Sequence, residues 1–286
     1  MTSPADRNRV WRADPELAAA LEALGWPDRS ALESAFGQKA SSGRSATALL
    51  ALPGRPERLH LRRVQHGGWL GPLWAGAIWG ADRPLEEWEA HTRLHAAGAP
   101  VPRPALVAAW RARGPLWTAV YGTVHVEGAR DGVVWLAEAP PRPTLLDGAR
   151  AAGAAIRRFH DAGGAHSDLH LKNLLFRPSA AGTGAGVEAW VIDLDRARVG
   201  SPPGPARRMR ELMRLLRSLS KRGVAEQVGA RGCAAAFGAY CAGDRALRRQ
   251  LLMSRAWEER RNALHALAYR KPPPPAASTS GADPGG

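Results

Sequence analysis

Residues 166–176 read HSDLHLKNLLF and residues 190–196 read WVIDLDR, and these two segments decide the fold. Asp168 and Asn173 are five residues apart on a segment that follows a predicted helix and enters a predicted strand. Asp193 closes the next predicted strand, 25 residues after Asp168. Carboxylate and amide oxygens are the ligands that Mg²⁺ prefers. The spacing therefore predicts that two acids and one amide converge on a bound magnesium ion.

This arrangement is typical of phosphoryl transfer. The reaction requires an acceptor hydroxyl in line with the γ-phosphate of ATP and divalent cations that offset charge on the phosphate oxygens. Kinases meet both needs with an Asp and an Asn in one loop and a metal-binding Asp after a short hairpin. We therefore expect ATP and Mg²⁺ as cofactors and a catalytic loop with Asp168 at its centre. His166, two residues earlier, matches a histidine that supports the backbone of kinase loops.

Other residues of the two segments allow two interpretations each. A single Asp in a loop more often caps a turn, but the joint register of His166, Asp168, Asn173 and Asp193 favours catalysis over that role. Lys172 either offsets charge on the moving phosphoryl group, as a catalytic residue, or is a solvated loop lysine. Asp195 either binds a second metal ion or pairs with the nearby Arg196 or Arg198 and shapes the loop.

The first half of the chain holds candidate nucleotide contacts. SSGRSATALL (residues 41–50) places Gly43 and Arg44 in a turn that either covers phosphates with backbone amides or is a plain β-turn. Arg62 and Arg63 lie on a predicted strand, where kinases place the Lys that binds the α/β-phosphates. Strand alternation puts Arg63 on the same side as Leu59 and Leu61. Glu87, on the next predicted helix, is either the ion-pair partner of this arginine or part of a solvated helix face.

Apolar periodicity divides the chain into two parts. We predict helices over 15–24 and 83–97 and strands over 46–52, 58–61, 105–112 and 116–124 in the first part. The second part has predicted helices over 144–162, 207–221, 225–240 and 245–269 and strands over 173–176 and 187–193. This pattern predicts an α+β, bilobal protein-kinase-like fold. We expect a flexible N-terminus (1–14), a nucleotide-binding N-lobe (15–125), a C-lobe with the catalytic loops and the acceptor site (126–270) and a disordered tail (271–286), with the hinge near 122–128.

Composition limits the partners and the compartment. The 286 residues carry a formal net charge of +14, which attracts polyanions but does not choose between nucleic acid and an anionic membrane. No apolar run approaches the roughly 18 to 20 residues of a membrane span, and no export signal is visible. Two cysteines in such a chain indicate reduced cytoplasmic thiols. The histidines and cysteines lack the spacing of a transition-metal site.

Several segments, in order, resemble the lipopolysaccharide core kinase family, and most of all its 3-deoxy-D-manno-octulosonic acid (Kdo) kinases. The matching segments are GRSA (43–46), LRRVQHGG (61–68), DRPLEEWEAHTRLHAAGAPVPRP (82–104), FHDAGGAHSDLHLKNLLF (159–176), VIDLDRAR (191–198) and RLLRSLSK (214–221). The chain departs from the family pattern at His170, where Asn is common, and at Leu194, where Phe is common. The resemblance extends over roughly residues 40–225.

The resemblance implies transfer of phosphate from ATP to the 4-hydroxyl of Kdo on lipid A. The enzyme would be peripheral on the cytoplasmic face of a bacterial inner membrane, in contact with an anionic membrane surface and with no specific nucleic acid. By position, Asp168 resembles the catalytic base, and Asn173 and Asp193 resemble the magnesium ligands. The glycine-anchored match selects Arg62 as the nucleotide contact, with Glu87 as its partner.

Two other functions remain open on the sequence alone. A small-molecule phosphotransferase of the aminoglycoside or choline kinase type shares the His-x-Asp and Asn spacing, although such enzymes usually offer an acidic acceptor site. A pseudokinase that binds anionic lipid or nucleic acid is favoured by Arg in place of the usual Lys. The arginines at 207, 208, 210, 214 and 217 form either a membrane-docking patch or a solvated helix face.

Overall fold

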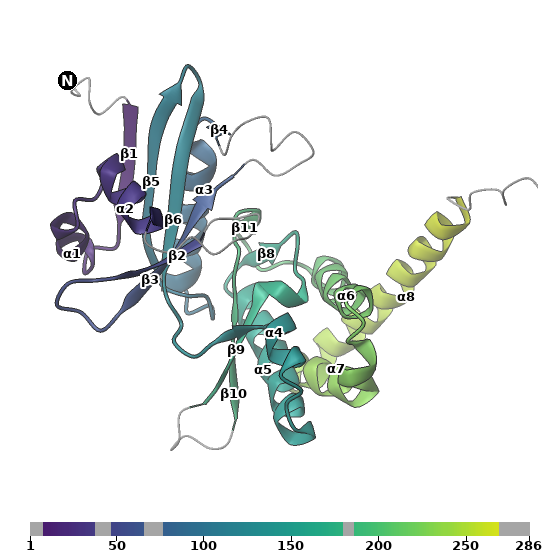
Figure 1. Cartoon of the computed structure of the whole chain (residues 1–286). Helices are drawn as coiled ribbons and strands as arrows, with labels where there is room; N and C mark the ends of the chain where they lie inside the picture. The colour runs from purple at the N-terminus through teal and green to yellow at the C-terminus, as the bar shows by residue number, and fades with distance from the viewer. Residues whose placement is uncertain (1–7, 38–46, 66–76, 180–185, 269–286) are drawn as a thin grey trace, which may run out of the picture.

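The computed structural model describes residues 8–37, 47–65, 77–179 and 186–268, with side chains described as far as Ala256. Its first part is an antiparallel sheet with helices, and its second part is mostly helical (Figure 1). The chain passes from one part to the other after residue 124, where the last long strand ends. The predicted hinge began at Gly122, which instead lies inside that strand and is paired with Leu61 and Leu106.

The first part is built on a six-stranded sheet with the order β1-β5-β6-β3-β2, and β4 also pairs with β6. All of the pairings are antiparallel. The strands are β1 (Arg9–Ala13), β2 (Thr47–Ala51), β3 (Arg58–Val64), β4 (Ile78–Trp79), β5 (Pro104–Arg113) and β6 (Leu116–Val124).

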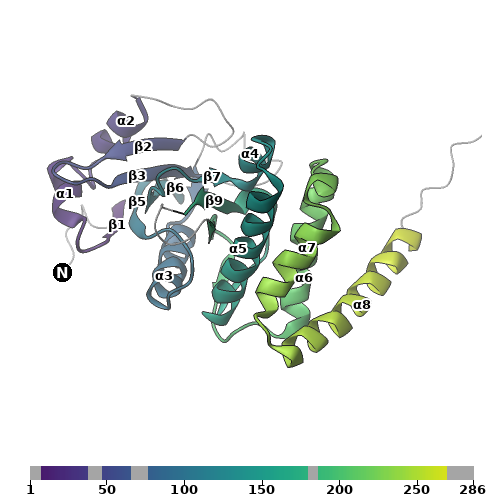
Figure 2. The same ribbon diagram turned by 90° about the horizontal axis from the view of Figure 1, so that it is seen from below.

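Helices cover both faces of this sheet, so its strands are apolar on both sides. The helices α1 (Ala18–Ala23) and α2 (Arg29–Gly37) pack with Leu59, Leu61 and Leu106 on one face. The helix α3 (Asp82–Ala96) lies on the other face, next to Val107 and Tyr121. Figure 2 shows α2 and α3 on opposite sides of the strands. Successive side chains of a strand point to opposite faces of the sheet. In β3 this alternation decides whether Arg62 or Arg63 faces α3 and can contact Glu87.

Three expectations for the first part need correction. Residues 9–13 are not loose: they form β1, because Trp11 and its neighbours pair with β5 and pack against the α1 and α2 layer. The helix expected over 15–24 is shorter and is followed by α2, which the sequence pattern did not indicate. α2 contributes Leu32 and Phe36 to the core, so its helical form depends on that burial.

The second part begins with the short β7 (Arg130–Asp131) and then becomes helical. The helix α4 (Gly132–Ala137), which was not predicted, is capped by the preceding residue Asp131, whose carboxylate accepts the backbone N–H groups of Val133 and Val134. The remaining elements are α5 (Arg142–Asp161), β8 (Gly164–His166), the 3₁₀ turn η3 (Leu171–Asn173), β9 (Leu174–Pro178), β10 (Val187–Val191), β11 (Ala197–Val199), α6 (Pro205–Lys221), α7 (Ala225–Cys241) and α8 (Arg245–Ala268).

The helices α5 and α7 approach each other closely at a glycine. A Cβ atom added to Gly153 would stand 2.0 Å from the carbonyl oxygen of Ala236, so only glycine fits this crossing. One hydrophobic core, centred on Ile156, Phe159 and Tyr240, joins these helices to the catalytic segment through Leu169 and Leu171. The helix α8 extends away from this body in both views (Figures 1 and 2). The predicted catalytic segment, residues 166–173, therefore packs against the helices of the second part.

Candidate active site

The two predicted loops meet, and His166 joins them. Its ring is buried, and its Nδ1 atom accepts the backbone N–H of Asp168 at 3.2 Å. The proton must then be on Nε2, which donates to the carbonyl oxygen of Ile192 at 3.1 Å. One imidazole thus links the backbone at Asp168 to the backbone at Ile192, the residue before Asp193. Because both ring nitrogens are engaged with backbone, we assign His166 a positioning role and no direct part in catalysis.

Asn173 is also buried and also fixes the catalytic loop. Its side-chain Nδ2 donates to the carbonyl oxygen of Asp168 at 3.1 Å, and its own carbonyl oxygen accepts the N–H of Ile192 at 3.0 Å. The amide oxygen Oδ1 is left without a hydrogen bond in the described part of the chain. It is therefore available as an oxygen ligand next to Asp193.

Asp193 has a backbone conformation that favours glycine. Its φ angle is +60°, one of three positive values among the described non-glycine residues. Such strain is concentrated at functional sites, where the surrounding structure imposes it. The carboxylate is exposed and makes no hydrogen bond or ion pair with the described residues.

The oxygens of Asn173 and Asp193 fit a hard divalent cation. Mg²⁺ is usually bound by one or two protein oxygens, with phosphate and water completing the shell. The described residues contain no cluster of three or more His, Cys, Asp or Glu side chains that would hold a metal ion by themselves. Asn173 and Asp193 offer two side-chain oxygen donors, a number that Mg²⁺ usually takes from a protein.

Asp195 has a different partner from the one expected. It forms an ion pair with Arg83, in the first turn of α3, and not with Arg196 or Arg198. The reason is tertiary: α3 packs against β11, so its N-terminal turn reaches the segment that follows Asp193. This pair ties the sheet-covering helix to the proposed metal loop.

Arg62 and Glu87 form the expected ion pair, between β3 and α3. Glu87 is buried, and burial raises the pKa of its carboxyl above the ordinary value even though the guanidinium of Arg62 opposes this rise. Its Oε2 atom is buried without a hydrogen-bond partner in the described structure. The pKa of Arg62 is also raised: burial lowers it, but Glu87, Asp193 and Asp195 outweigh that effect. Arg62 therefore stays charged beside the metal loop.

Arg63 points to the other face of the sheet. Its guanidinium lies 4.7 Å from the ring centre of Phe36 on α2, on the side of Leu59 and Leu61, as strand alternation predicted. Arg62 is thus the residue of this pair that faces the acidic loop. Gly43 and Arg44, the other expected nucleotide contacts, lie outside the described residues. Lys172 is exposed and has no hydrogen bond or ion pair in the described part of the chain.

One stripe of α6 follows the catalytic segment. Glu211 accepts the backbone N–H of His166 at 2.9 Å, and Ser218 accepts the N–H of Leu171 at 3.0 Å. Between them, Arg214 Nη1 donates to Asp168 Oδ1 at 3.2 Å. Positions 211, 214 and 218 share one helix face, which explains the regular order of these contacts. Two of them anchor the loop backbone, and the middle one reaches the predicted catalytic carboxylate.

These contacts revise the interpretation of the arginine-rich face. Arg207 pairs with Glu211, Arg208 with Asp161, and Arg214 with Asp168. Arg217 is exposed and has no ion pair within the described residues, whereas Arg210 has an interaction of its own. Most of this face is therefore part of the fold and the site, which weakens its interpretation as a membrane-docking patch.

A buried polar network stands behind the loop. His160 is fully buried; its Nε2 donates to Glu211 at 3.1 Å, and Tyr240 O–H donates to its Nδ1 at 2.7 Å. Burial lowers the pKa of His160. Burial raises the pKa of Glu211, but the hydrogen bonds from His160 and His166 outweigh it, so the net shift is downward. The carboxylate of Glu211, which accepts the backbone N–H of His166, is thus ionised, and His160 is neutral.

A second buried histidine gives a testable pH dependence. His91 Nε2 donates to the carbonyl oxygen of Pro102, Tyr121 O–H donates to its Nδ1, and burial lowers the pKa of His91 to about 4. Between pH 6.5 and 4 only the unfolded chain binds this proton, so stability falls as the pH falls. We expect His91 alone to account for a loss of about 2 kcal/mol in the free energy of unfolding between pH 7 and pH 5.

The measurement is urea unfolding at the two pH values for the wild type and for His91→Gln. Gln can keep both hydrogen bonds but does not titrate. The variant should lose about 2 kcal/mol less than the wild type on acidification. Equal losses in the two proteins would show that the pKa of His91 is the same in the folded and unfolded chain, which would contradict the lowered pKa.

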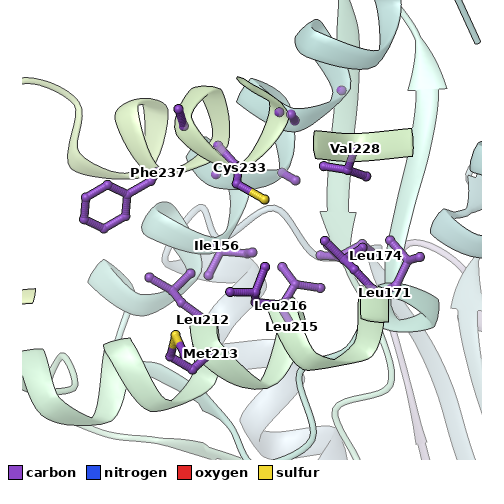
Figure 3. Close-up of a pocket in the computed structure, with 18 of the residues that line it drawn as sticks. Ile156, Leu171, Leu174, Leu212, Met213, Leu215, Leu216, Val228, Cys233 and Phe237 are labelled. Carbon is purple, nitrogen blue, oxygen red and sulfur yellow. The ribbon is translucent and has the colours of Figure 1, made fainter. Parts of the chain in front are cut away.

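A cavity of about 450 Å³ lies behind the catalytic loop, between α5, α6 and α7. Figure 3 shows Ile156, Leu171, Leu216 and Cys233 directed into it, among other apolar side chains. Phosphate groups and magnesium need polar partners, and apart from Arg255 and the Cys233 thiol the side chains that line this cavity are apolar. The cavity is thus distinct from the cluster formed by Asp168, Asn173 and Asp193. Cys233 and Cys241 are both free thiols.

Several site residues were missed from the sequence. Arg214 was considered only as one of several arginines on a predicted helix, and Glu211 and Arg83 were not singled out. Their partners are 46, 45 and 112 residues away, respectively. A period of three to four residues linking Glu211, Arg214 and Ser218 was the available signal. It becomes informative only when the helix is known to lie against the catalytic loop.

Among the described residues, no helix has the length and apolar character needed to cross a membrane. The fold is similar to that of a solved structure described as WaaP in complex with acyl carrier protein, with a TM-score of 0.55 and 20% identity over 90% of this chain and 98% of the other. This likeness supports the protein-kinase-like fold.

Curated relatives are similar at higher identity. The 3-deoxy-D-manno-octulosonic acid kinase of Vibrio cholerae is 33% identical over 165 residues, which is 56% of this chain and 65% of the relative. The kinase of the same name from Xanthomonas axonopodis pv. citri is 32% identical over 222 residues, or 76% of this chain and 79% of the relative. The chain thus spans slightly less than two thirds of the Vibrio protein. The lipopolysaccharide kinase (Kdo/WaaP) family profile matches residues 75–234. Because that match takes in more than half of the chain, the protein belongs to the lipopolysaccharide kinase (Kdo/WaaP) family.

Proposed function

We propose that the protein is an ATP- and Mg²⁺-dependent kinase that phosphorylates a sugar hydroxyl of the lipopolysaccharide inner core, specifically the 4-hydroxyl of Kdo on lipid A. The observation that carries this proposal is the junction made by His166. It ties the backbone of Asp168 to the carbonyl of Ile192, the residue before Asp193, and Asn173 Nδ2 donates to the carbonyl oxygen of Asp168. These contacts support the convergence of the three side chains that phosphoryl transfer to a hydroxyl requires.

In this proposal Asp168 acts on the acceptor. Its side chain is 55% exposed, so a sugar hydroxyl can approach it from solvent. The carboxylate orients the hydroxyl and takes its proton as the oxygen attacks the γ-phosphorus, while ADP leaves on the opposite side. Asn173 donates to the carbonyl oxygen of Asp168 and thereby keeps the loop in place. Lys172, exposed in the same loop, would offset charge on the moving phosphoryl group.

The nucleotide would lie between β3 and the metal loop. Arg62 is held by Glu87 and would bind the α/β-phosphates in the manner of the kinase lysine, with a planar head that can make two parallel hydrogen bonds. Asn173 and Asp193 would hold Mg²⁺, which when bound offsets the negative charge of the phosphate oxygens. With Asp195 paired to Arg83, we propose that Asp195 holds the loop rather than a second metal ion.

The location follows from the acceptor. Kdo on lipid A is a lipid-linked anion at the cytoplasmic face of the inner membrane, and the chain has a net charge of +14. Each Lys or Arg near an anionic membrane contributes about 1 kcal/mol of attraction. We propose peripheral binding at that face and no specific recognition of nucleic acid.

The rival acceptors are cationic small molecules such as aminoglycosides or choline. Arg214 next to Asp168 opposes them, because a guanidinium at the acceptor position repels a cationic substrate. The test is ATP consumption with Mg²⁺ in the presence of Kdo-lipid A, an aminoglycoside or choline. We expect turnover with Kdo-lipid A. Turnover with only the cationic compounds would replace the proposal, and absence of any turnover would favour a pseudokinase.

We also propose a partner for the apolar cavity behind the catalytic loop. The structurally similar WaaP is described in complex with acyl carrier protein, and such carriers present a fatty acyl chain. A cavity of about 450 Å³ lined by side chains such as Leu171, Leu216 and Phe237 suits a hydrocarbon chain. It is about three times the size of an apolar cavity of ~150 Å³ that binds benzene. We infer that an acylated carrier protein inserts its chain here.

A direct binding measurement checks this partner. Acyl carrier protein loaded with a hexadecanoyl chain should bind at least ~10-fold more tightly than the carrier without an acyl chain. Cys233→Trp, which fills the cavity, should abolish that difference, whereas Cys233→Ser should keep it. Equal affinity for the loaded and unloaded carriers would refute the insertion of a chain.

A further inference from the structure

We infer that Arg214 forms an anion-binding subsite beside Asp168 that selects acceptors carrying a carboxylate or phosphate close to the reacting hydroxyl. The inference rests on the proposed kinase function and specifies its acceptor. The residue is on α6, and its guanidinium touches Asp168 Oδ1 at 3.2 Å. An acceptor hydroxyl that is hydrogen-bonded to Asp168 must therefore lie within a few ångströms of a positive charge.

Hydrogen bonds on either side of Arg214 hold α6 against the predicted catalytic segment. Glu211, three residues before Arg214, binds the backbone of His166, and Ser218, four residues after it, binds the backbone of Leu171. Both anchoring side chains are buried. Arg214 is thus carried on a helix that is fixed to the catalytic segment on either side of it. Such support is what a specificity-determining side chain requires.

Arg214 also has N–H groups that the contact with Asp168 does not use. A guanidinium has five N–H groups, and the contact with Asp168 uses one of them. The side chain is 43% exposed, so the remaining donors are accessible from solvent on the side from which an acceptor arrives. Exposed ion pairs of this kind contribute little to stability, so Arg214 can shift toward an incoming anion at small cost.

The charge balance of the site favours an anionic acceptor. Asp168 alone would repel a carboxylate or phosphate brought next to it. Arg214 on one oxygen cancels that charge. A carboxylate four bonds from the hydroxyl oxygen, as the C1 carboxylate is from the 4-hydroxyl of Kdo, can then form a bidentate pair with Arg214 while the hydroxyl binds Asp168. A 3-deoxy sugar acid such as Kdo has this combination of groups.

Equilibrium binding without nucleotide tests the subsite independently of turnover. The probes are free Kdo and its methyl ester, which lacks the charge, and the proteins are the wild type, Arg214→Gln, Arg214→Lys and Arg217→Gln. Wild type should bind the acid about 10- to 100-fold more tightly than the ester, which is the range expected for a hydrogen bond to a charged group. Arg214→Gln should abolish this preference. Arg214→Lys should keep part of it, and the exposed neighbour Arg217→Gln should keep all of it.

Turnover with Kdo-lipid A provides the second readout. In Arg214→Gln the KM for the acceptor should rise about 10- to 100-fold, while the KM for ATP stays unchanged. If the acid and the ester bind equally well to wild type, or if Arg214→Gln weakens both to the same extent, the anion subsite is refuted. Failure of wild type to consume ATP, with the binding preference intact, would instead refute the kinase function and leave the subsite standing.

Discussion

Replacement of Asp168 by Asn should reduce turnover by about 10²- to 10⁴-fold, the usual range for loss of a general base. The amide has the shape of the carboxylate but cannot take a proton from the acceptor hydroxyl. The fold should not change, because the Asp168 contacts with His166 and Asn173 are made by its backbone. The side chain itself is 55% exposed, and exposed substitutions usually change stability by less than about 0.5 kcal/mol.

Steady-state kinetics with ATP, Mg²⁺ and Kdo-lipid A, together with nucleotide binding, check this prediction. Asp147→Asn is the matched control, because Asp147 is an acid on α5 that pairs only with Arg150 among the described residues. It should retain full activity. Wild-type turnover in Asp168→Asn with unchanged folding would mean that another group accepts the proton.

The second large effect concerns the buried pair of Arg62 and Glu87. Arg62→Met should lower the free energy of unfolding by about 3–5 kcal/mol, because it leaves a buried carboxylate without its partner. Met fills much of the space of the arginine side chain, whose guanidinium carbon lies 5.3 Å from the centre of the Tyr121 ring. Adding Glu87→Leu removes the unpaired charge, so the double variant should return to within about 1 kcal/mol of wild type.

Activity should behave differently from stability in this series. Both Arg62→Met and the double variant lack the proposed phosphate contact, so turnover should fall about 10²- to 10³-fold in each. Urea unfolding and ATP kinetics on the four proteins of the cycle give the two quantities separately. Recovery of activity along with stability in the double variant would show that Arg62 serves the fold alone.

Features formed by residues close together in the sequence could be predicted, whereas features that depend on contacts between distant elements could not. The contact between residues 166–173 and the segment before Asp193 was predictable, because the spacing of His166, Asp168, Asn173 and Asp193 is a recognisable local pattern. The catalytic and metal-binding roles of these residues stay a prediction. The choice of Arg62 over Arg63 agrees with strand alternation once the two faces of the sheet are known. β1 was missed because a strand of mixed polarity is defined by its pairing with β5.

The partners of charged residues were the least predictable feature. Asp195 was expected to pair with a neighbour in the chain, but the docking of α3 brings Arg83 to it instead. Arg214 was one of several arginines on an amphipathic helix, and only the contact of that helix with residues 166–171 distinguishes it. Helix periodicity gives the face of a residue but not the surface that the face meets.

The central claim is that Asp168, held beside Asn173 and Asp193, directs phosphate from ATP to a Kdo hydroxyl. Mass spectrometry of lipid A and core sugars, from cells that lack the protein and are supplied with either wild type or Asp168→Asn, tests it most directly. We predict one added phosphate on Kdo with wild type and none with the variant. An identical, unphosphorylated Kdo in both strains, or the same phosphate in both, would contradict the assignment.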